Sequence, residues 1–335
     1  MTGRSTIDDV AARSGVSTAT VSRVLSGSVP ARPETRERVL AAARDLGYRP
    51  SGIARALKRR ETRTLGLVVT DITNPFYPQV VRAVEAAAHE RGYGIVLANG
   101  GDDPTRELEH LDRLVERRVD GIVIASSRMT RRHAERLRAA AVPVVLVNDT
   151  VAGSGLPSVT TAHRHGARMA AEHLVGLGHR SIGHISAPAE HPAAGLRRQG
   201  VRDALRAAGI EDPLTAIGDG GVAGGASAAE ALLAAGVTAI VAYNDLTAIG
   251  ALRALRRAGI RVPDDVSLVG FDDIDLAAWT DPPLTTIRQP IDELGRSAVG
   301  HLVNLIGGGR AGAATTVLEP SLVVRDSTGP APPAR

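Results

Sequence analysis

The sequence contains no cysteine, a single lysine and only seven aromatic residues among its 335 residues. The lack of cysteine excludes disulfides and thiolate metal sites. With so few aromatics, the core must be built mainly from Ala, Val, Leu and Ile. No stretch approaches the roughly 18 to 20 apolar residues that cross a bilayer, and the first residues lack the apolar centre of a signal peptide. We therefore expect a cytoplasmic protein with no membrane segment.

Positive charge is concentrated at the amino-terminal end of the chain. The net charge is +4, but residues 1–63 alone carry +7, so the remainder carries −3. Nucleic-acid affinity depends on clustered cations that displace counterions from phosphates. A general bias toward arginine would not confine the excess to one end. The basic region is therefore the candidate nucleic-acid-binding part of a chain long enough for about two folding units.

From Leu65 onward, strand-like apolar runs alternate with helical patterns. This alternation is typical of parallel sheets that are covered by helices on both faces. The runs are residues 65–69, 93–98, 121–125, 143–147, 181–185, 239–243 and 267–271. Gly92, Gly178 and Gly259 follow helical segments, where a left-handed residue ends a helix. The pattern predicts an α/β fold with two lobes, and residues 326–335, which lack apolar periodicity, are expected to form a disordered tail.

The basic region predicts a helix-turn-helix head over residues 1–50. Thr6, with Asp9 three residues later, has the spacing of a capping box, so we expect a first helix from about Ile7. Gly15 permits a tight turn, and Ser17 can cap a second helix. A third helix, with a proline in its first turn, would complete the small core.

The second predicted helix has two different faces. Val21, Val24 and Leu25 share an apolar face at helical spacing. The opposite face presents side chains that can approach base edges in a major groove: Thr18, Ala19, Ser22 and Arg23. A three-helix unit without a role in DNA binding is the alternative, which the concentration of charge disfavours.

The head resembles the signature of the lactose-repressor/galactose-repressor (LacI/GalR) family of bacterial regulators. The segment TIDDVAARSGVSTATVSRVLSG carries the likeness, which extends through NDLTAIGALRALRRAGIRVPDDVSLVGFDD and PPLTTIRQP to about Arg325. The resemblance implies a two-lobed domain like periplasmic binding proteins, and a homodimer that binds a near-palindromic DNA operator and a small-molecule effector. The predicted DNA contacts in the head are Thr6, Ser17, Thr18, Ala19, Thr20, Ser22 and Arg23.

The basic connector SGIARALKRRETR, residues 51–63, is expected to act as a hinge. Ile53, Ala54 and Leu57 have helical spacing, but an isolated helix this short is marginal in water. In the resembling family the segment forms a hinge helix whose leucine enters the minor groove. The resemblance therefore predicts DNA contacts from Ala54, Arg55 and Leu57, and a flexible charged linker is the alternative.

Polar and aromatic residues follow several strand-like runs, where parallel sheets bind ligands. These candidates are Asn74, Phe76, Tyr77, Ser126, Asn148, Asn244 and Asp272. The resemblance implies effector contacts from Asn148, Arg197, Asn244, Asp272 and Gln289. Amides and carboxylates beside aromatic surface favour a sugar or sugar derivative, and a corepressor that is not a sugar is the alternative. The sensing domain is expected over residues 64–325, with lobe 1 at about 64–160 and 288–320 and lobe 2 at about 161–287.

Some positions depart from the family pattern. Ala162 and His163 stand where many members have Asp-Asn, and Gly220 stands where an aromatic residue commonly stacks on the ligand. Three aromatic side chains remain as replacement stacking surfaces: Phe76, Tyr77 and Trp279. Asp245 and Asp273 also follow strands, but we expect Asp245 to cap a helix rather than bind a ligand, and a ligand role for Asp273 is equally doubtful.

Other functions have weaker support in the sequence. GDGGVAGGAS, from Gly218, is a loose variant of the dinucleotide fingerprint, but no full βαβ context is evident and we favour a flexible loop. The histidines between 163 and 191 lack metal-ligand spacing, and no nucleophile motif or phosphate loop occurs, so we expect no metal, no cofactor and no catalysis. A transport binding protein would share the two-lobed plan, but the basic head disfavours it.

Overall fold

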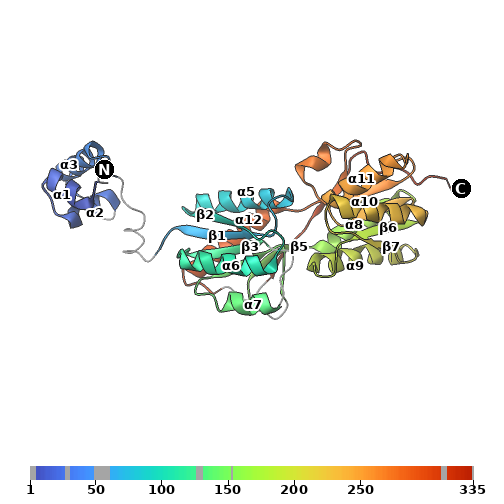
Figure 1. Cartoon of the computed structure of the whole chain (residues 1–335), viewed down its shortest axis with the longest axis horizontal. Helices are drawn as coiled ribbons and strands as arrows, with labels where there is room; N and C mark the ends of the chain where they lie inside the picture. The colour runs from blue at the N-terminus through green and yellow to red at the C-terminus, as the bar shows by residue number, and fades with distance from the viewer. Residues whose placement is uncertain are drawn as a thin grey trace. The chain divides into compact units, whose positions relative to one another are not determined.

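In the computed structural model of the chain, the described residues of the amino-terminal unit, residues 1–63, form three short helices (Figure 1). The structure describes residues 5–26, 31–48, 61–125, 131–151, 154–310 and 315–333. The helices are α1 (Ile7–Ser14), α2 (Thr18–Ser26) and α3 (Pro33–Asp45). Their apolar faces meet in a core of Val10, Ala11, Val21, Val24, Val39, Ala42 and Ala43. No helix among the described residues is long and apolar enough to cross a membrane.

The predicted capping pattern of the head is confirmed. Thr6 Oγ1 accepts a hydrogen bond from the amide of Asp9 (3.3 Å), and the Asp9 carboxylate accepts one from the amide of Thr6 (2.7 Å). Gly15 follows α1 with φ of 66°, a left-handed conformation that glycine adopts without steric cost. Ser17 Oγ accepts from the amide of Thr20 (3.3 Å) at the start of α2. Local spacing thus determines where α1 and α2 begin.

The larger unit, residues 64–335, contains two lobes, and the first lobe is built on a six-stranded parallel sheet with the order β11-β5-β4-β3-β1-β2. Its strands are β1 (Thr64–Val69), β2 (Gly94–Asn99), β3 (Gly121–Ala125), β4 (Val144–Val147), β5 (Ser158–Thr161) and β11 (Thr315–Leu318). Helices α5 and α12 cover one face of the sheet, and α6 and α7 cover the other (Figure 1). These helices are α5 (Phe76–Glu90), α6 (Pro104–Glu116), α7 (Arg131–Arg138) and α12 (Ile291–Ile306).

The second lobe has a sheet of order β12-β10-β9-β8-β6-β7, in which only the β10–β12 pair is antiparallel among the described strands. Its strands are β6 (Ile182–Ser186), β7 (Leu214–Ile217), β8 (Ala239–Ala242), β9 (Ser267–Asp272), β10 (Thr285–Arg288) and β12 (Ser321–Val323). Helices α10 and α11 pack together on one face, and α8 and α9 pack on the other. These elements are α8 (His163–Gly176), α9 (Pro192–Ala207), α10 (Val222–Ala234), α11 (Asp245–Arg257) and the short 3₁₀ helix η1 (Asp275–Ala278).

Seven of these strands coincide with the seven predicted apolar runs, and five were not predicted. Strands β5, β7, β10, β11 and β12 have only three or four residues each, so no apolar run marks them. The predicted helix stops are confirmed, because Gly92, Gly178 and Gly259 have φ of 74°, 93° and 74°. The recognised strands lie in sequence runs of five or six largely apolar residues, although β4 and β8 themselves have only four residues, whereas the other five strands lack such a run.

The prediction of a disordered tail after Arg325 is wrong. Residues 326–333 lie along the second lobe, where Ser327 is fully buried. Ser327 Oγ accepts from the amide of Thr285 (2.8 Å) and donates to the carbonyl of Leu268 (2.6 Å). The carbonyl of Gly329 lies 3.1 Å from His179 Nε2. Polar pairing, which leaves no apolar periodicity in the sequence, holds this segment in place.

Candidate functional site

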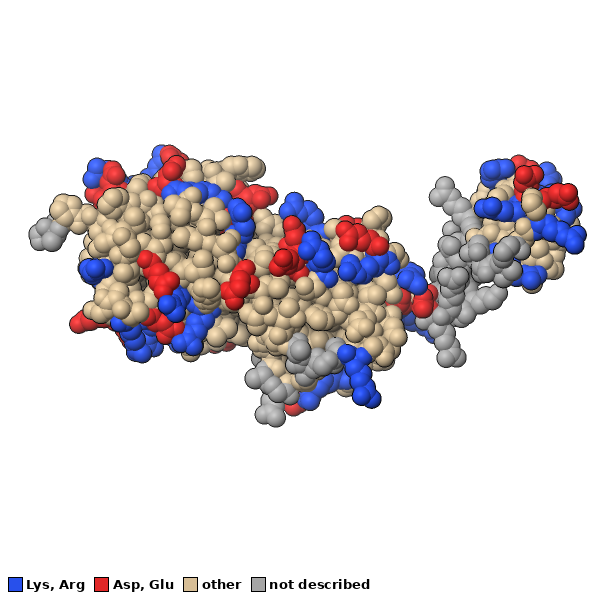
Figure 2. Space-filling view, turned by 180° about the vertical axis from the view of Figure 1, so that it is seen from behind, with Lys and Arg blue, Asp and Glu red and all other residues tan. Residues whose placement is uncertain are grey.

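The exposed face of α2 carries the predicted DNA-reading residues of the head. Thr18, Ala19 and Arg23 are exposed, whereas Thr20 and Ser22 are half-buried. The Arg23 guanidinium lies back along the helix, with Nε donating to the carbonyl of Ala19 (3.3 Å). Figure 2 shows basic side chains on the visible face of this unit, with acidic side chains among them. Thr6 and Ser17 act as helix caps in the structure, and Ala54, Arg55 and Leu57 lie outside the described residues.

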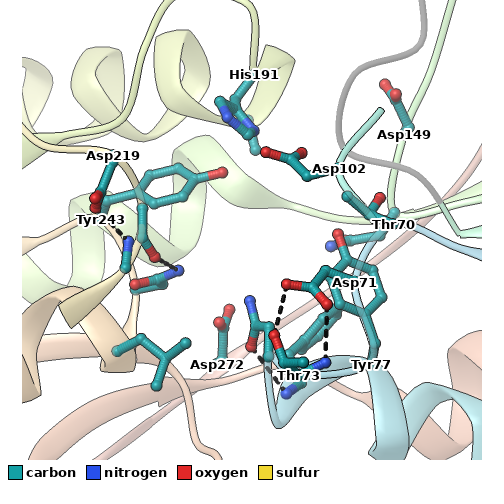
Figure 3. Close-up of a pocket in the computed structure, with 18 of the residues that line it drawn as sticks. Thr70, Asp71, Thr73, Tyr77, Asp102, Asp149, His191, Asp219, Tyr243 and Asp272 are labelled. Carbon is teal, nitrogen blue, oxygen red and sulfur yellow. Dashed lines mark hydrogen bonds between the residues drawn. The ribbon is translucent and has the colours of Figure 1, made fainter. Parts of the chain in front are cut away.

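A cavity of about 420 Å³ lies in the larger unit, with walls from both lobes (Figure 3). Lobe 1 contributes Thr70, Asp71, Thr73, Asn74, Phe76, Tyr77, Asp102, Asn148 and Asp149. Lobe 2 contributes His191, Pro192, Ala193, Arg197, Asp219, Gly220, Gly221, Tyr243, Asn244, Leu246 and Asp272. Seven of the predicted effector residues are therefore brought together. Gln289 is not among the described lining residues, and Ser126 lies outside the described part of the chain.

Arg197, on α9, is the central cation of the lobe 2 wall. Its side chain is 4% exposed, and its guanidinium donates to the carbonyl of Tyr243. The Cζ atom lies 3.6 Å from the centre of the Phe271 ring and 4.7 Å from that of Tyr243. Nη2 lies 3.6 Å from Asp272 Oδ1. Its Nε is buried and has no hydrogen-bond partner among the described residues, so one donor remains unused.

Asp272, at the end of β9, is held from behind by Gln289. Gln289 Nε2 donates to Asp272 Oδ1 (2.7 Å), and Gln289 Oε1 accepts from Thr161 Oγ1 (2.6 Å). Burial raises the pKa of Asp272, and the nearby Arg197 and the bond from Gln289 oppose that rise. In this structure Gln289 therefore positions the carboxylate of Asp272, which lines the cleft, and is not itself among the lining residues.

Two expectations about residues after β8 and near η1 need correction. Asn244, not Asp245, caps α11, since its Oδ1 accepts from the amide of Thr247 (2.8 Å). Asp245 is fully buried and accepts from Thr286 Oγ1 and the amide of Ile274. Trp279 is 78% exposed and is not among the lining residues, so it does not replace the missing stacking surface.

Tyr243 was missed by the sequence reasoning although it contributes aromatic surface to the cavity. It lies directly after β8, in the apolar run AIVAY, so it was assigned to a buried strand. A Cβ atom at Gly220 would lie 3.7 Å from its ring, so the small residue leaves the ring open. On the other wall, Phe76 and Tyr77 pack edge to face, with ring centres 5.3 Å apart. The cavity therefore has aromatic surface on both walls.

Asn148 is the lobe 1 residue with an unused polar atom. It follows β4 with φ of 59°, a left-handed conformation that asparagine tolerates better than most residues. Its buried Oδ1 has no hydrogen-bond partner among the described residues. Asn74, by contrast, uses its Oδ1 to accept from the amide of Phe76 (3.1 Å). The cavity thus holds an unused acceptor on one wall and an unused donor, Arg197 Nε, on the other.

His163 occupies the position that departs from the family pattern, and it lies behind the cavity. It is 3% exposed, and its Nδ1 is 3.4 Å from Arg197 Nη2. Burial, with a further contribution from Arg197, lowers the pKa of His163 well below 6.5. A neutral imidazole at this position can sit beside the guanidinium without charge repulsion.

The glycine-rich loop at residues 218–221 lies between β7 and α10, and β8 follows that helix. The expectation that no βαβ context exists is therefore wrong. However, Asp219 Oδ1 accepts from the amides of Gly221 (2.8 Å) and Gly224 (3.2 Å). The protein's own carboxylate thus occupies the amides that a dinucleotide phosphate would need.

Further polar lining residues were also missed, among them Asp102, Asp149, His191 and Asp219. The rule that polar residues follow strands would have found Asp102 after β2 and Asp149 beside Asn148. It fails for Asp219, because the strand before it was not recognised. Among the described residues no group of His, Asp or Glu is arranged to hold a metal ion.

Comparison with known proteins connects both units to one family. Residues 6–51 match the model for bacterial regulatory proteins of the lacI family. Residues 62–323 match the model for periplasmic binding proteins and the sugar binding domain of the LacI family.

Individual relatives match over almost their full length. The chain is 36% identical over 327 residues to the HTH-type transcriptional repressor CytR of Escherichia coli (strain K12), covering 96% of both chains. A structure of the lac repressor dimer bound to operator and the anti-inducer ONPF matches with a TM-score of 0.89 at 31% identity, covering 98% of this chain and all of that one. A complex of the transcriptional regulator CelR with cellobiose matches with a TM-score of 0.74 at 37% identity, covering 97% and 100%.

Proposed function

Because the chain belongs to the LacI family of bacterial regulatory proteins, we propose that it is a transcriptional repressor that binds a near-palindromic operator as a homodimer and is switched by an effector. The observation that carries the DNA-binding part is the exposed α2 face of Thr18, Ala19 and Arg23 on a unit of net charge +7. Small side chains there allow close approach to base edges, and arginine can donate to guanine or phosphate. Such a protein acts where the DNA is, in the cytoplasm.

The connector supplies the second part of the proposed operator contact. Residues 51–60 contain Leu57 among four basic residues, and a wedge inserted into the minor groove bends DNA and widens that groove. Ordering this segment costs conformational entropy, which dimer pairing and phosphate contacts must offset. DNA affinity would therefore depend on the state of the larger unit.

The homodimer is supported by the lac repressor dimer among similar structures and by exposed apolar side chains of the larger unit. Trp279 is 78% exposed, and Ile72 and Leu276 are each 41% exposed. Ile72 and Leu276 line a groove between the start of α5 and η1. A second copy of the chain would remove this apolar surface from water.

The effector is proposed to bind between the lobes and to be a sugar or a similar hydroxylated metabolite. The cavity has hydrogen-bonding groups and aromatic surface on both walls, and one similar structure holds cellobiose. A ligand that contacts both walls changes the population of closed lobes. Moving such an equilibrium from 1:99 to 99:1 requires about 5.5 kcal/mol of differential affinity.

A DNA-retardation experiment tests the proposal. Purified protein should retard a near-palindromic fragment from its own gene neighbourhood, and a sugar that raises its melting temperature should change that retardation in either direction. Leu57→Ala should weaken operator binding at least about tenfold while sedimentation still shows a dimer. Leu214→Ala, at a 46% exposed leucine of β7, serves as the matched control. Failure to retard any such fragment would refute the function.

A further inference from the structure

The charge and hydrogen-bonding pattern of the cleft selects among the polar ligands that it could hold. Resting on the effector-sensing function proposed above, we infer that the effector presents hydroxyl or amine groups and carries no phosphate or carboxylate group. Neutral sugars, nucleosides and amino sugars belong to this class, whereas sugar phosphates, sugar acids and nucleotides do not.

Carboxylates dominate the charge of the cleft. Among the described lining residues there are five aspartates and one arginine: Asp71, Asp102, Asp149, Asp219, Asp272 and Arg197. They come from both walls, so a ligand between the lobes faces carboxylates on either side (Figure 3). Like charges repel more strongly at a partly desolvated site than in water. An anionic group would therefore lose affinity here.

The one arginine is already committed to the protein. Arg197 donates to the carbonyl of Tyr243, lies 3.6 Å from Asp272 and is flanked by two aromatic rings. A bidentate grip on a phosphate or carboxylate needs two parallel N–H donors. Only Nε is without a partner among the described residues. A bidentate grip through Nε and Nη2 would have to compete with Asp272 and His163 for Nη2, whereas Nε alone can donate one hydrogen bond to a hydroxyl.

The helix ends that face the cleft already use several of their first amides within the protein. Anions bind helix amino-termini through free backbone amides. Three helices have such amides bonded to their own side chains: Phe76 to Asn74 on α5, Gly221 and Gly224 to Asp219 on α10, and Thr247 to Asn244 on α11. Helix α9 begins at Pro192, which has no amide hydrogen, and the amide of Ala194 donates to the carbonyl of His191.

What the cleft offers is an excess of acceptors. The Asn148 Oδ1 atom is buried without a partner among the described residues, and the aspartates add further oxygen acceptors. Hydroxyl and amine groups donate to such atoms, whereas ionised phosphate and carboxylate groups only accept. The same residues that reject anions therefore bind vicinal hydroxyls.

Matched ligand pairs test this inference. Binding would be measured by calorimetry at constant ionic strength for ribose and ribose 5-phosphate, glucose, glucosamine and glucose 6-phosphate, and cytidine and cytidine 5′-monophosphate. At least one neutral or amine-bearing compound should bind, and its phosphate ester should bind at least about tenfold more weakly. A phosphate ester that binds as tightly as its parent would overturn the inference.

A substitution separates charge from size. Asp219→Asn keeps an oxygen for the amides of Gly221 and Gly224 but removes one negative charge. It should therefore narrow the gap in binding affinity between each parent compound and its phosphate ester several-fold. Asp264→Asn, which changes net charge equally at a residue that does not line the cavity, should leave the gap unchanged. A gap that persists in Asp219→Asn would indicate exclusion by size and contradict the inference.

The two proposals fail in distinguishable ways. If no neutral or amine-bearing compound in the panel binds, the assigned ligand class is wrong. DNA retardation with the same preparation then shows whether regulator function fails as well, because retardation of a fragment without any added compound supports DNA binding independently of the ligand class.

Discussion

The two walls of the cleft differ in how far their polar atoms are already bonded within the protein. On the lobe 2 wall, Arg197 is bonded and sandwiched, Asp272 is held by Gln289, and Asn244 caps α11. On the lobe 1 wall, the Oδ1 of Asn148 has no partner among the described residues. Apart from Arg197 Nε, these lobe 2 groups form a preorganised surface, whereas lobe 1 supplies Asn148 Oδ1, which a ligand or water would satisfy. Substitutions should separate these two roles.

The largest effect is expected on the lobe 2 wall. Arg197→Ala leaves the carboxylate of Asp272 buried without its cation, so the free energy of unfolding should fall by about 3–5 kcal/mol at pH 7.5, measured by urea denaturation. Arg202→Ala, which breaks an exposed pair with Asp212, should change the free energy of unfolding far less, because water screens that pair. Equal losses for the two variants would mean that Arg197 does not organise this wall.

The second effect concerns the polar tail behind lobe 2. Ser327→Ala removes a hydroxyl that bonds the amide of Thr285 and the carbonyl of Leu268, both in buried surroundings. The free energy of unfolding should fall by about 1–3 kcal/mol in the same assay. Ser321→Ala, at an exposed position of β12, serves as a control and should change it by less than about 0.5 kcal/mol. Similar losses of unfolding free energy in the two variants would show that the tail does not support the lobe 2 wall.

The head and the cleft also differ in how much of them could be predicted from sequence. The capping box of Thr6 and Asp9 depends on a spacing of three residues, so a local pattern reveals it. The role of Gln289 depends on Thr161, 128 residues away, and on Asp272 in another strand. Family resemblance placed Gln289 near the effector, but only the fold shows that it acts through Asp272.

The third prediction compares a loss of ligand affinity on the lobe 1 wall with a loss of stability on the lobe 2 wall. Asn148→Gly retains the left-handed backbone and removes the unpaired amide oxygen, so it should weaken effector binding about tenfold in calorimetry with a ligand identified by the panel above. The free energy of unfolding should change by less than about 1 kcal/mol. Asn244→Ala should instead lower that free energy by about 1 kcal/mol, because it removes a helix cap. A loss of stability in Asn148→Gly together with unchanged stability in Asn244→Ala would contradict this difference between the walls.

The smallest effect tests whether the rigid wall depends on neutral histidine. Burial, with smaller contributions from Arg197 and Arg198, lowers the pKa of His184 to about 4, and a hydrogen bond to the carbonyl of Val241 opposes this change. The unfolded chain binds a proton near pH 6.5 while the folded chain does not, so His184 makes the protein less stable as pH falls below 6.5. At pH 5.5 this linkage amounts to about 1 kcal/mol relative to pH 7.5.

His184→Asn keeps a donor for Val241 and cannot titrate, so its unfolding free energy should fall about 1 kcal/mol less than that of the parent chain between pH 7.5 and 5.5. Comparing the pH slopes of the two chains cancels the opposite contribution of Asp245 and Asp272, whose raised pKa values favour the folded state as pH falls. If the unfolding free energies of the two chains change equally with pH, His184 is not held neutral in the folded protein. The preorganisation of lobe 2 would then rest on the bonds of Arg197, Gln289 and Asn244.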